Sequence, residues 1–243
     1  QQVKHFETVN TDWFDILTQD AHSSFHTVDV SGGTKEVRYY GSLGYDKDNG
    51  VIKNSFSDRY SMRMNFDGNI TSKLKMNLRL NGNVQKRNNH IRENNPIDYA
   101  YNTTRALPVY NEDGSLYYYN NTPVSTGRTQ DRFSYNILNE LENSSDTYNG
   151  SGMNANLDLR YTFSPEFDLS MGGTYTRNNT TQQLWWGDRT NYVAGLRNSE
   201  YGVLPPKGEL GRSSLPYGGS IKNTNTVSDN FGFRLQSDFR KSF

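Results

Sequence analysis

The chain has 243 residues, and its 26 basic and 26 acidic side chains give a formal net charge of zero. This balance argues against a nucleic-acid binder that relies on bulk positive charge. The absence of cysteine excludes a disulfide framework, a thiolate metal site and a thiol nucleophile.

No signal peptide opens the sequence, and no apolar run reaches the length of about 18 residues that a transmembrane helix needs. The mean hydropathy of −0.90 is low, yet a membrane β-strand needs apolar residues only at alternate positions. Aromatic residues make up 13% of the chain. This composition suits a membrane barrel with aromatic girdles, and it also suits an extracellular β-sandwich that binds sugars.

Residues 1–20 show no alternation, and Asp12 is predicted to cap a short helical turn through residues 15–17. Beyond them, seven segments alternate between apolar and polar residues and are predicted to be strands. The predicted strands are 25–31, 36–45, 56–70, 74–87, 152–163, 167–177 and 229–239.

The pair from Phe56 to Val84 shows the pattern best, because one set of alternate positions is apolar throughout and the other is polar. A period of two places the two sets on opposite faces of a sheet. A strand over 56–70 would be about 50 Å long, enough to cross an apolar membrane band of about 25 Å when tilted.

The connections between these segments alternate without exception between short and long. The short ones are 32–35, 71–73 and 164–166, and the long ones are 46–55, 88–151 and 178–228. An up-and-down antiparallel sheet then has all short turns at one edge, as outer-membrane barrels do. Within 88–151 we expect a short helix over 97–105, a small hairpin over 107–119 and a helical turn over 135–141.

Several segments resemble the SusC/RagA group of TonB-dependent transporters, and the resemblance runs from about residue 11 to the end. The matching segments are Thr11-Asp12-Trp13-Phe14-Asp15, Tyr39-Tyr40-Gly41-Ser42-Leu43-Gly44-Tyr45, Asp58-Arg59-Tyr60-Ser61-Met62-Arg63-Met64-Asn65, Pro108-Val109-Tyr110-Asn111-Glu112-Asp113-Gly114 and Asn139-Glu140-Leu141-Glu142-Asn143. Those between residues 11 and 65 are the densest and the most specific.

The resemblance implies an all-β, antiparallel, up-and-down transmembrane barrel segment with long extracellular loops. We expect residues 1–20 to be a connecting segment and residues 21–243 to be part of a larger barrel. The plug domain, the TonB-contacting segment and about two thirds of the barrel are expected to be missing, because seven strands cannot close so large a barrel.

The resemblance further implies an importer of nutrient oligosaccharides or peptides in the outer membrane of a Gram-negative, Bacteroidetes-like bacterium, and not an enzyme. The implied partners are a SusD-like surface lipoprotein, TonB acting through the plug, membrane lipid and lipopolysaccharide. The alternatives are a secreted or surface β-sandwich that binds glycans and, less favoured, a porin-like barrel independent of TonB.

Two sets of side chains are candidates for function. Loop residues able to stack on or hydrogen-bond a sugar or a peptide are Tyr99, Tyr101, Tyr118, Trp185, Trp186, Asp188 and Arg189. The lumen-facing candidates for contact with the plug are Arg59, Arg63, Asn65 and Arg79. The four histidines share no metal-ligand spacing, so no catalytic residue, metal or cofactor is predicted.

Overall fold

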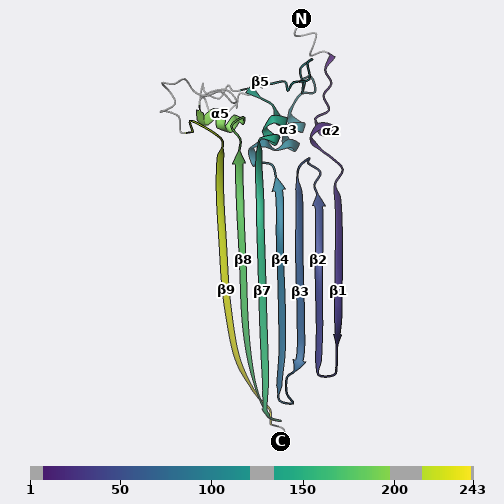
Figure 1. The fold of residues 1–243 in the computed structure, drawn as a ribbon, viewed down its shortest axis with the longest axis vertical. Coiled ribbons are helices and arrows are strands. Elements are labelled where there is room, and N and C mark those ends of the chain that lie inside the picture. Colours follow the sequence, from purple (N-terminus) through teal and green to yellow (C-terminus); the bar gives the residue numbers. More distant parts are fainter. Residues whose placement is uncertain (1–7, 121–133, 198–214, 242–243) are drawn as a thin grey trace.

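The computed structural model describes residues 8–120, 134–197 and 215–241. Within these residues, seven long strands form one antiparallel sheet in the order β1-β2-β3-β4-β7-β8-β9 (Figure 1). The strands are β1 (His22–Gly33), β2 (Val37–Asn49), β3 (Phe56–Asn69), β4 (Leu74–Asn89), β7 (Ser144–Ser164), β8 (Phe167–Trp186) and β9 (Ser220–Phe239). Neighbours in the sheet are neighbours in sequence, which confirms the up-and-down topology.

The predicted strands are confirmed, but β1 extends beyond the predicted 25–31 at both ends, β2 ends at Asn49 rather than at 45, and β7, β8 and β9 were predicted much too short at one end. β7 begins at Ser144 rather than at 152, β8 continues to Trp186 rather than ending at 177, and β9 begins at Ser220 rather than at 229. In these extensions most outward-facing positions carry Ser, Thr, Asn or Gln, so the regular alternation disappears while the backbone ladder continues. The long connections are correspondingly shorter, covering 50–55, 90–143 and 187–219.

The short turns lie at one end of the sheet and the long connections at the other (Figure 1). Successive short turns also step away from the long connections. The last pair of β1 and β2, Gly33 with Arg38, is in register with Asp158, whereas β7 continues to Ser164. This stagger is the shear that a barrel requires when its strands tilt.

The described parts of the long connections, together with residues 11–20, form a layer at one end of the sheet, which we call the cap. It contains α2 (Trp13–Leu17), the 3₁₀ turn η1 (Arg92–Asn94), α3 (Pro96–Asn102), β5 (Tyr119–Asn120), β6 (Ser134–Tyr135), α4 (Ile137–Glu142) and α5 (Asn191–Arg197). The predicted helical turns are confirmed, although α3 ends at Asn102 rather than at 105; the side chains of Asp12, Asn95 and Asn136 cap α2, α3 and α4. In the predicted hairpin, the Tyr117 amide donates to the Val109 carbonyl at 2.8 Å.

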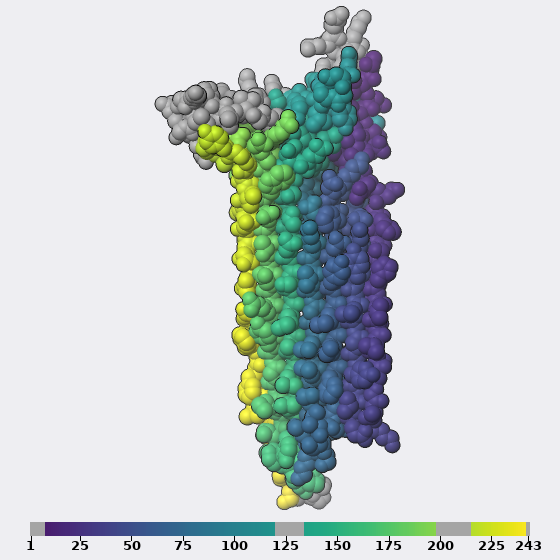
Figure 2. All heavy atoms as spheres, viewed as in Figure 1, coloured from purple at the N-terminus to yellow at the C-terminus, as the bar shows by residue number. Residues whose placement is uncertain are grey.

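The hydrophobic core of the described residues lies in the cap and not against the sheet. One cluster joins Trp13 and Leu17 of α2 to Ala100, Tyr135 and Ile137. The strands, in contrast, carry exposed apolar side chains, such as Val28 at 74% and Phe231 at 80% exposure. The sheet side chains lie open along the face shown in Figure 2, with the cap at one end only. Such a sheet needs an apolar surrounding on one face.

Candidate functional site

The apolar face of the sheet forms a band with aromatic edges. On β2 the band runs from Val37 to Tyr45, and on β8 it runs from Phe167 to Tyr175. At the edge nearer the cap, Tyr45 stacks on Tyr60 with 4.7 Å between ring centroids. Tyr175 stacks on Phe231 in the same way, at 4.9 Å. Aromatic rings at the edges of an apolar band are typical of membrane interfaces.

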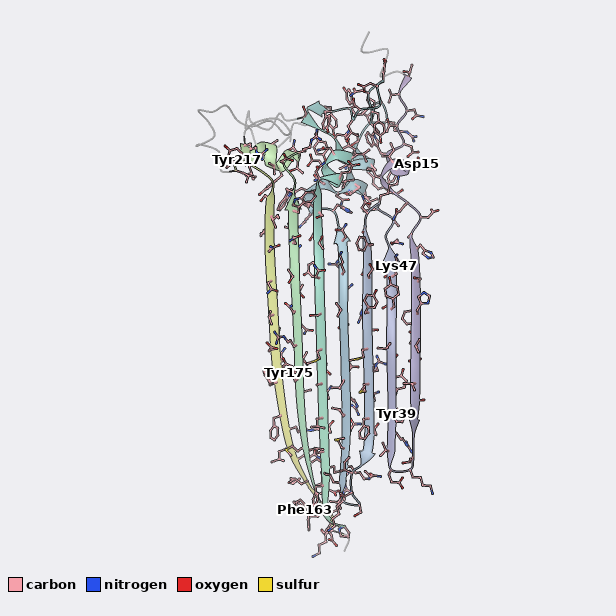
Figure 3. The ribbon with its side chains drawn as sticks, viewed as in Figure 1. Asp15, Tyr39, Lys47, Phe163, Tyr175 and Tyr217 are labelled. Atoms are coloured by element: carbon pink, nitrogen blue, oxygen red, sulfur yellow. The ribbon has the colours of Figure 1, made fainter. Side chains whose placement is uncertain are left out.

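This band is slanted relative to the strand register. Tyr45 is in register with Asn179, yet the band on β8 ends at Tyr175, four residues farther from the cap. The edge far from the cap is displaced by the same four residues: Val37 is in register with Met171, while the band on β8 continues to Phe167. In Figure 3, Tyr175 at the upper edge of the band on β8 lies farther from the cap than Lys47, which is one outward-facing position beyond the upper edge on β2.

The slant of the band gives the angle by which the strands are tilted from the normal of the membrane that would surround them. Four residues correspond to about 13 Å along a strand, and the four steps from β2 to β8 span about 19 Å. A level membrane therefore requires strands tilted by about 35°, within the range of outer-membrane barrels. At this tilt, the eight residue steps from Val37 to Tyr45 give a band about 22 Å high, close to the usual height of about 25 Å.

Charged side chains begin one outward-facing position beyond the upper edge. Asp58 accepts a hydrogen bond from the Tyr45 hydroxyl at 3.2 Å, and Asp229 accepts one from the Tyr175 hydroxyl at 2.9 Å. Arg177 lies 3.8 Å from the Asp229 carboxylate. The same tyrosine–aspartate arrangement thus marks the end of the band on strands far apart in the sheet.

The four candidates for plug contact lie on the opposite, polar face of β3 and β4. Arg63 is paired with Ser42 and Asn81, and Arg79 is paired with Asn65 and Asn156, so their direct cross-strand neighbours are neutral. Arg59 lies opposite Asp46. Among the ion pairs of the described residues, none includes these arginines. The guanidinium groups of Arg59, Arg63 and Arg79 are exposed on this face.

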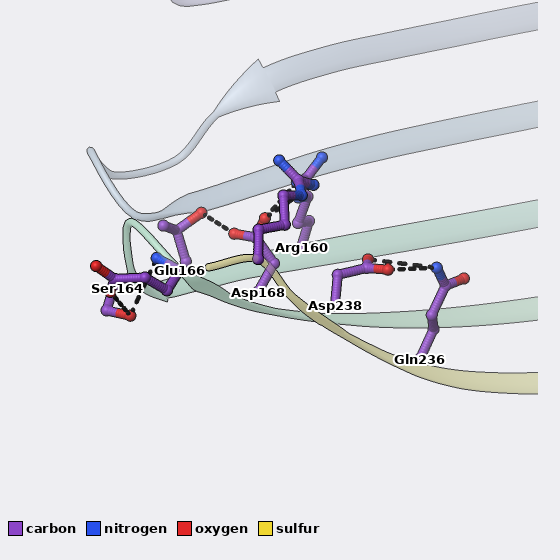
Figure 4. A network of polar contacts seen from close by, with 8 residues as sticks. Arg160, Ser164, Glu166, Asp168, Gln236 and Asp238 are labelled. Atoms are coloured by element: carbon purple, nitrogen blue, oxygen red, sulfur yellow. Dashed lines mark hydrogen bonds and ion pairs between the residues drawn. The ribbon is translucent and has the colours of Figure 1, made fainter. Parts of the chain in front are cut away.

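At the turn end of the polar face, the charged side chains are paired with one another (Figure 4). Asp168 accepts hydrogen bonds from Arg160 and from the Thr162 hydroxyl, the latter at 2.7 Å, and Arg240 lies 3.6 Å away. The Arg234 guanidinium donates to Asp158 at 3.0 Å. The sequence pattern placed these residues on the polar face but did not indicate the network, because its members come from three different strands.

Two candidate ligand-binding aromatics are packed inside the cap. The Tyr99 ring meets Trp13 edge-on at 5.0 Å, and its hydroxyl accepts a hydrogen bond from the Tyr119 hydroxyl at 3.1 Å. Burial raises the pKa of Tyr99 above its ordinary value. Trp186 is 9% exposed and stacks on Tyr192 at 4.5 Å. The sequence analysis placed Trp186 in the loop that follows β8, but in the structure Trp186 is the last residue of β8.

Two other aromatic candidates are more accessible but lie apart from each other. Tyr101 is 74% exposed, and its ring meets Phe14 of α2 edge-on at 4.9 Å. Trp185 also belongs to β8 and not to the loop, and the alternation of the strand places it on the same face as Tyr175.

The remaining candidates, Tyr118, Asp188 and Arg189, lie on two segments that α4 joins. The Tyr118 hydroxyl donates to Asn139 Oδ1 at 3.2 Å, while Asn139 Nδ2 donates to the Arg189 carbonyl at 2.7 Å. Burial raises the pKa of Tyr118, and the positive charge of Arg189 opposes this shift. The side chains of Asp188 and Arg189 are exposed. We call these three residues the cap triad.

Neither a membrane-spanning helix nor a cluster of metal ligands occurs in residues 8–120, 134–197 and 215–241. In these ranges no helix has the length and apolar character needed to cross a bilayer. The same ranges hold no group of three or more His, Asp or Glu side chains that could bind a metal ion.

Comparison with known proteins finds relatives in one group of receptors. The chain is 31% identical over 192 residues to the TonB-dependent receptor P26 of Formosa agariphila, covering 75% of the chain and 18% of that protein. It is 30% identical over 225 residues to the TonB-dependent receptor SusC of Bacteroides thetaiotaomicron, covering 80% and 22%. No family model matches the chain.

The fold is also similar to solved structures. A structure of the RagAB peptide importer in its closed-closed state matches 97% of the chain with a TM-score of 0.69 and 18% identity. A second RagAB peptide transporter structure matches with a TM-score of 0.66. The chain spans about a fifth of the length of the curated relatives and 24% of these structures. It belongs to the SusC/RagA type of TonB-dependent receptor, of which it is a seven-stranded segment of the barrel.

Proposed function

We propose that this chain is the wall and extracellular cap of one part of a TonB-dependent importer for nutrient oligosaccharides or peptides. The slanted apolar band supports the proposal best, since a membrane around the sheet would cover it at one level if the strands are tilted as in an outer-membrane barrel. The relatives add the receptor class. The chain would act without catalysis, in the outer membrane of a Gram-negative, Bacteroidetes-like cell.

The two faces and the cap would have different roles. The apolar band would contact lipid, and the charged residues beyond its upper edge, including Lys47 and Arg177, would face the headgroups of lipopolysaccharide. Arg59, Arg63, Asn65 and Arg79 would contact a plug domain that couples to TonB. Residues 21–243 would form the barrel part, with residues 1–20 as the connecting segment whose α2 packs into the cap.

In the cap, we propose that the triad of Tyr118, Asp188 and Arg189 contacts the substrate, together with the exposed Tyr101. A phenol ring close to the charge of Arg189, with the exposed carboxylate of Asp188 next to Arg189 in the chain, can stack on a sugar ring or hold a peptide. Trp185 remains a second candidate, whereas Tyr99 and Trp186 would support the cap from within. A SusD-like lipoprotein would cover this surface.

The β-sandwich alternative is disfavoured, because the seven long strands of the described residues form one sheet whose apolar face has no second sheet packed on it. The porin-like alternative is disfavoured by the receptor names of the relatives.

The test is deletion of the gene in its native host, followed by uptake measurements with a peptide mixture and with an oligosaccharide mixture. We expect uptake of one class to fall to background, and to return with the wild-type gene but not in cells lacking TonB. Unchanged uptake of both classes, or recovery of the protein without detergent as a soluble monomer, would overturn the proposal.

A further inference from the structure

Helix α4 buries polar side chains that a cap helix would ordinarily expose. Asn139 and Glu140 are 3% and 1% exposed, and their helix cap Asn136 is 3% exposed. Burying an amide or a carboxylate is costly unless it is hydrogen-bonded. The partners of these side chains therefore indicate what α4 holds in place.

On one side, α4 binds the backbone that follows β8 at every second residue. The Gly187 amide donates to the Asn143 carbonyl at 2.7 Å, and Asn139 Nδ2 donates to the Arg189 carbonyl at 2.7 Å. The Asn191 amide donates to Glu140 Oε1 at 2.9 Å. The exposed side chains of Asp188 and Arg189 are thus carried by a segment fixed at three successive points.

On the other side, α4 binds the hairpin that carries Tyr118. Asn136 Nδ2 donates to the carbonyls of Val109 and Tyr117 at 3.2 and 2.8 Å. The Tyr118 hydroxyl donates to Asn139, the residue that also binds Arg189. One helical turn therefore connects two segments that are about 70 residues apart in sequence, as the numbering of Tyr118 and Arg189 shows.

We infer that Asn139 and Glu140 are positioning residues that set the placement of Asp188 and Arg189 relative to Tyr118, and thereby determine which ligands the cap accepts. This inference rests on the proposed function of the cap triad. Neither residue would touch the ligand. Loss of either would free the 187–191 segment while leaving the triad side chains present, so discrimination between ligands should fall more than binding as such.

The experiment uses the intact membrane protein with Asn139→Ala, Glu140→Leu and Glu140→Gln, and with Glu142→Gln as the control. Glu142 is on the same helix but exposed. Glu140→Gln keeps an oxygen that can accept from the Asn191 amide, whereas Glu140→Leu removes it. Amide hydrogen exchange over residues 187–193 reports the attachment, and the affinities for a tryptic peptide mixture and a dextran oligosaccharide mixture report discrimination. Arg189→Ala is measured in parallel.

We expect Asn139→Ala and Glu140→Leu to accelerate exchange by about tenfold, the equivalent of one hydrogen bond, and to reduce the ratio of the two affinities at least fivefold. Glu140→Gln and Glu142→Gln should stay within about twofold of wild type. Unchanged exchange in both Asn139→Ala and Glu140→Leu would overturn the inference. Faster exchange with unchanged affinities, including those of Arg189→Ala, would confirm the attachment but refute the role of the triad in binding.

Discussion

Arginine substitution on the apolar face tests whether the band is a membrane surface with the deduced slant. Leu78 on β4 lies between Phe66 and Leu157, at the level where the two slanting edges place the middle of the band. Met171 is the midpoint of the band on β8. The two residues are in different register rows, since Leu78 is in register with Gly173.

Leu78→Arg and Met171→Arg should each lower the free energy of unfolding by about 2–4 kcal/mol relative to alanine at the same position, the cost of arginine at the midplane of a bilayer. Val84→Arg, next to the upper edge, should cost only about 0–1 kcal/mol. The alanine references separate the burial of a charge from the loss of packing, because both variants at a site remove the same apolar side chain.

Equilibrium unfolding of the intact protein in lipid vesicles, monitored by tryptophan fluorescence over a guanidinium series, gives these values. Arg79→Leu is the matched control on the polar face of the same strand and should be milder than Leu78→Arg. Equal costs at Leu78, Met171 and Val84 would refute the assignment of the band, and a small cost at Met171 with a large one at Leu78 would refute the slant.

Three further substitutions test the cap. Asn136→Ala should destabilise the cap by about 2–3 kcal/mol, because it removes the N-terminal capping side chain of α4 and the hydrogen bonds that Nδ2 donates to the carbonyls of Val109 and Tyr117; faster amide exchange in α4 would show this. Gly219→Ala should cost about 1–3 kcal/mol in thermal unfolding, because the added carbon would lie 2.2 Å from the Trp186 carbonyl oxygen. Burial lowers the pKa of His90 below its ordinary 6.5. The folded state thus favours neutral His90, so this contribution to stability is complete above about pH 6.5 and is lost as the pH falls below it. The protection factors of the cap amides, which correct for the slower intrinsic exchange at low pH, should therefore fall from pH 7.5 to pH 5, and His90→Gln should reduce that fall; an identical pH profile of protection in this variant would contradict the assignment.

The sequence predicted the sheet best where one face is apolar and the other polar. β3 and β4 were predicted within two residues at each end, because alternation extends along nearly their whole length. The strand prediction failed between the apolar band and the cap, where Thr147 and Gln183 face outward in place of apolar residues. There the strands continue only because their backbones are already paired.

In the cap, the sequence predicted where short helices occur but not how they pack against one another. Asp12 precedes its helix and acts locally, so the sequence pattern identified it as the capping residue; Asn95 and Asn136 act in the same way but were not predicted as caps. Asn139 and Glu140 have the sequence character of exposed residues, and their burial depends on a segment about 50 residues later. Trp186 was predicted to lie on a loop surface, because its burial also depends on distant residues. In the structure it packs against Ile91 and Val193.

The most direct test of the membrane assignment is a depth profile of spin labels along β2 and β8. The chain has no cysteine of its own, so single cysteines at successive positions give unique labels within it. In vesicles, collision with oxygen should exceed collision with a water-soluble nickel complex at alternate positions from Val37 to Tyr45 and from Phe167 to Tyr175, with Gly41 and Met171 at equal depth. Two results would contradict a barrel wall whose strands are tilted by about 35° in the membrane. One is a profile without alternation. The other is a profile in which Met171 has the same depth as Val37, as expected from the strand register if the strands were not tilted.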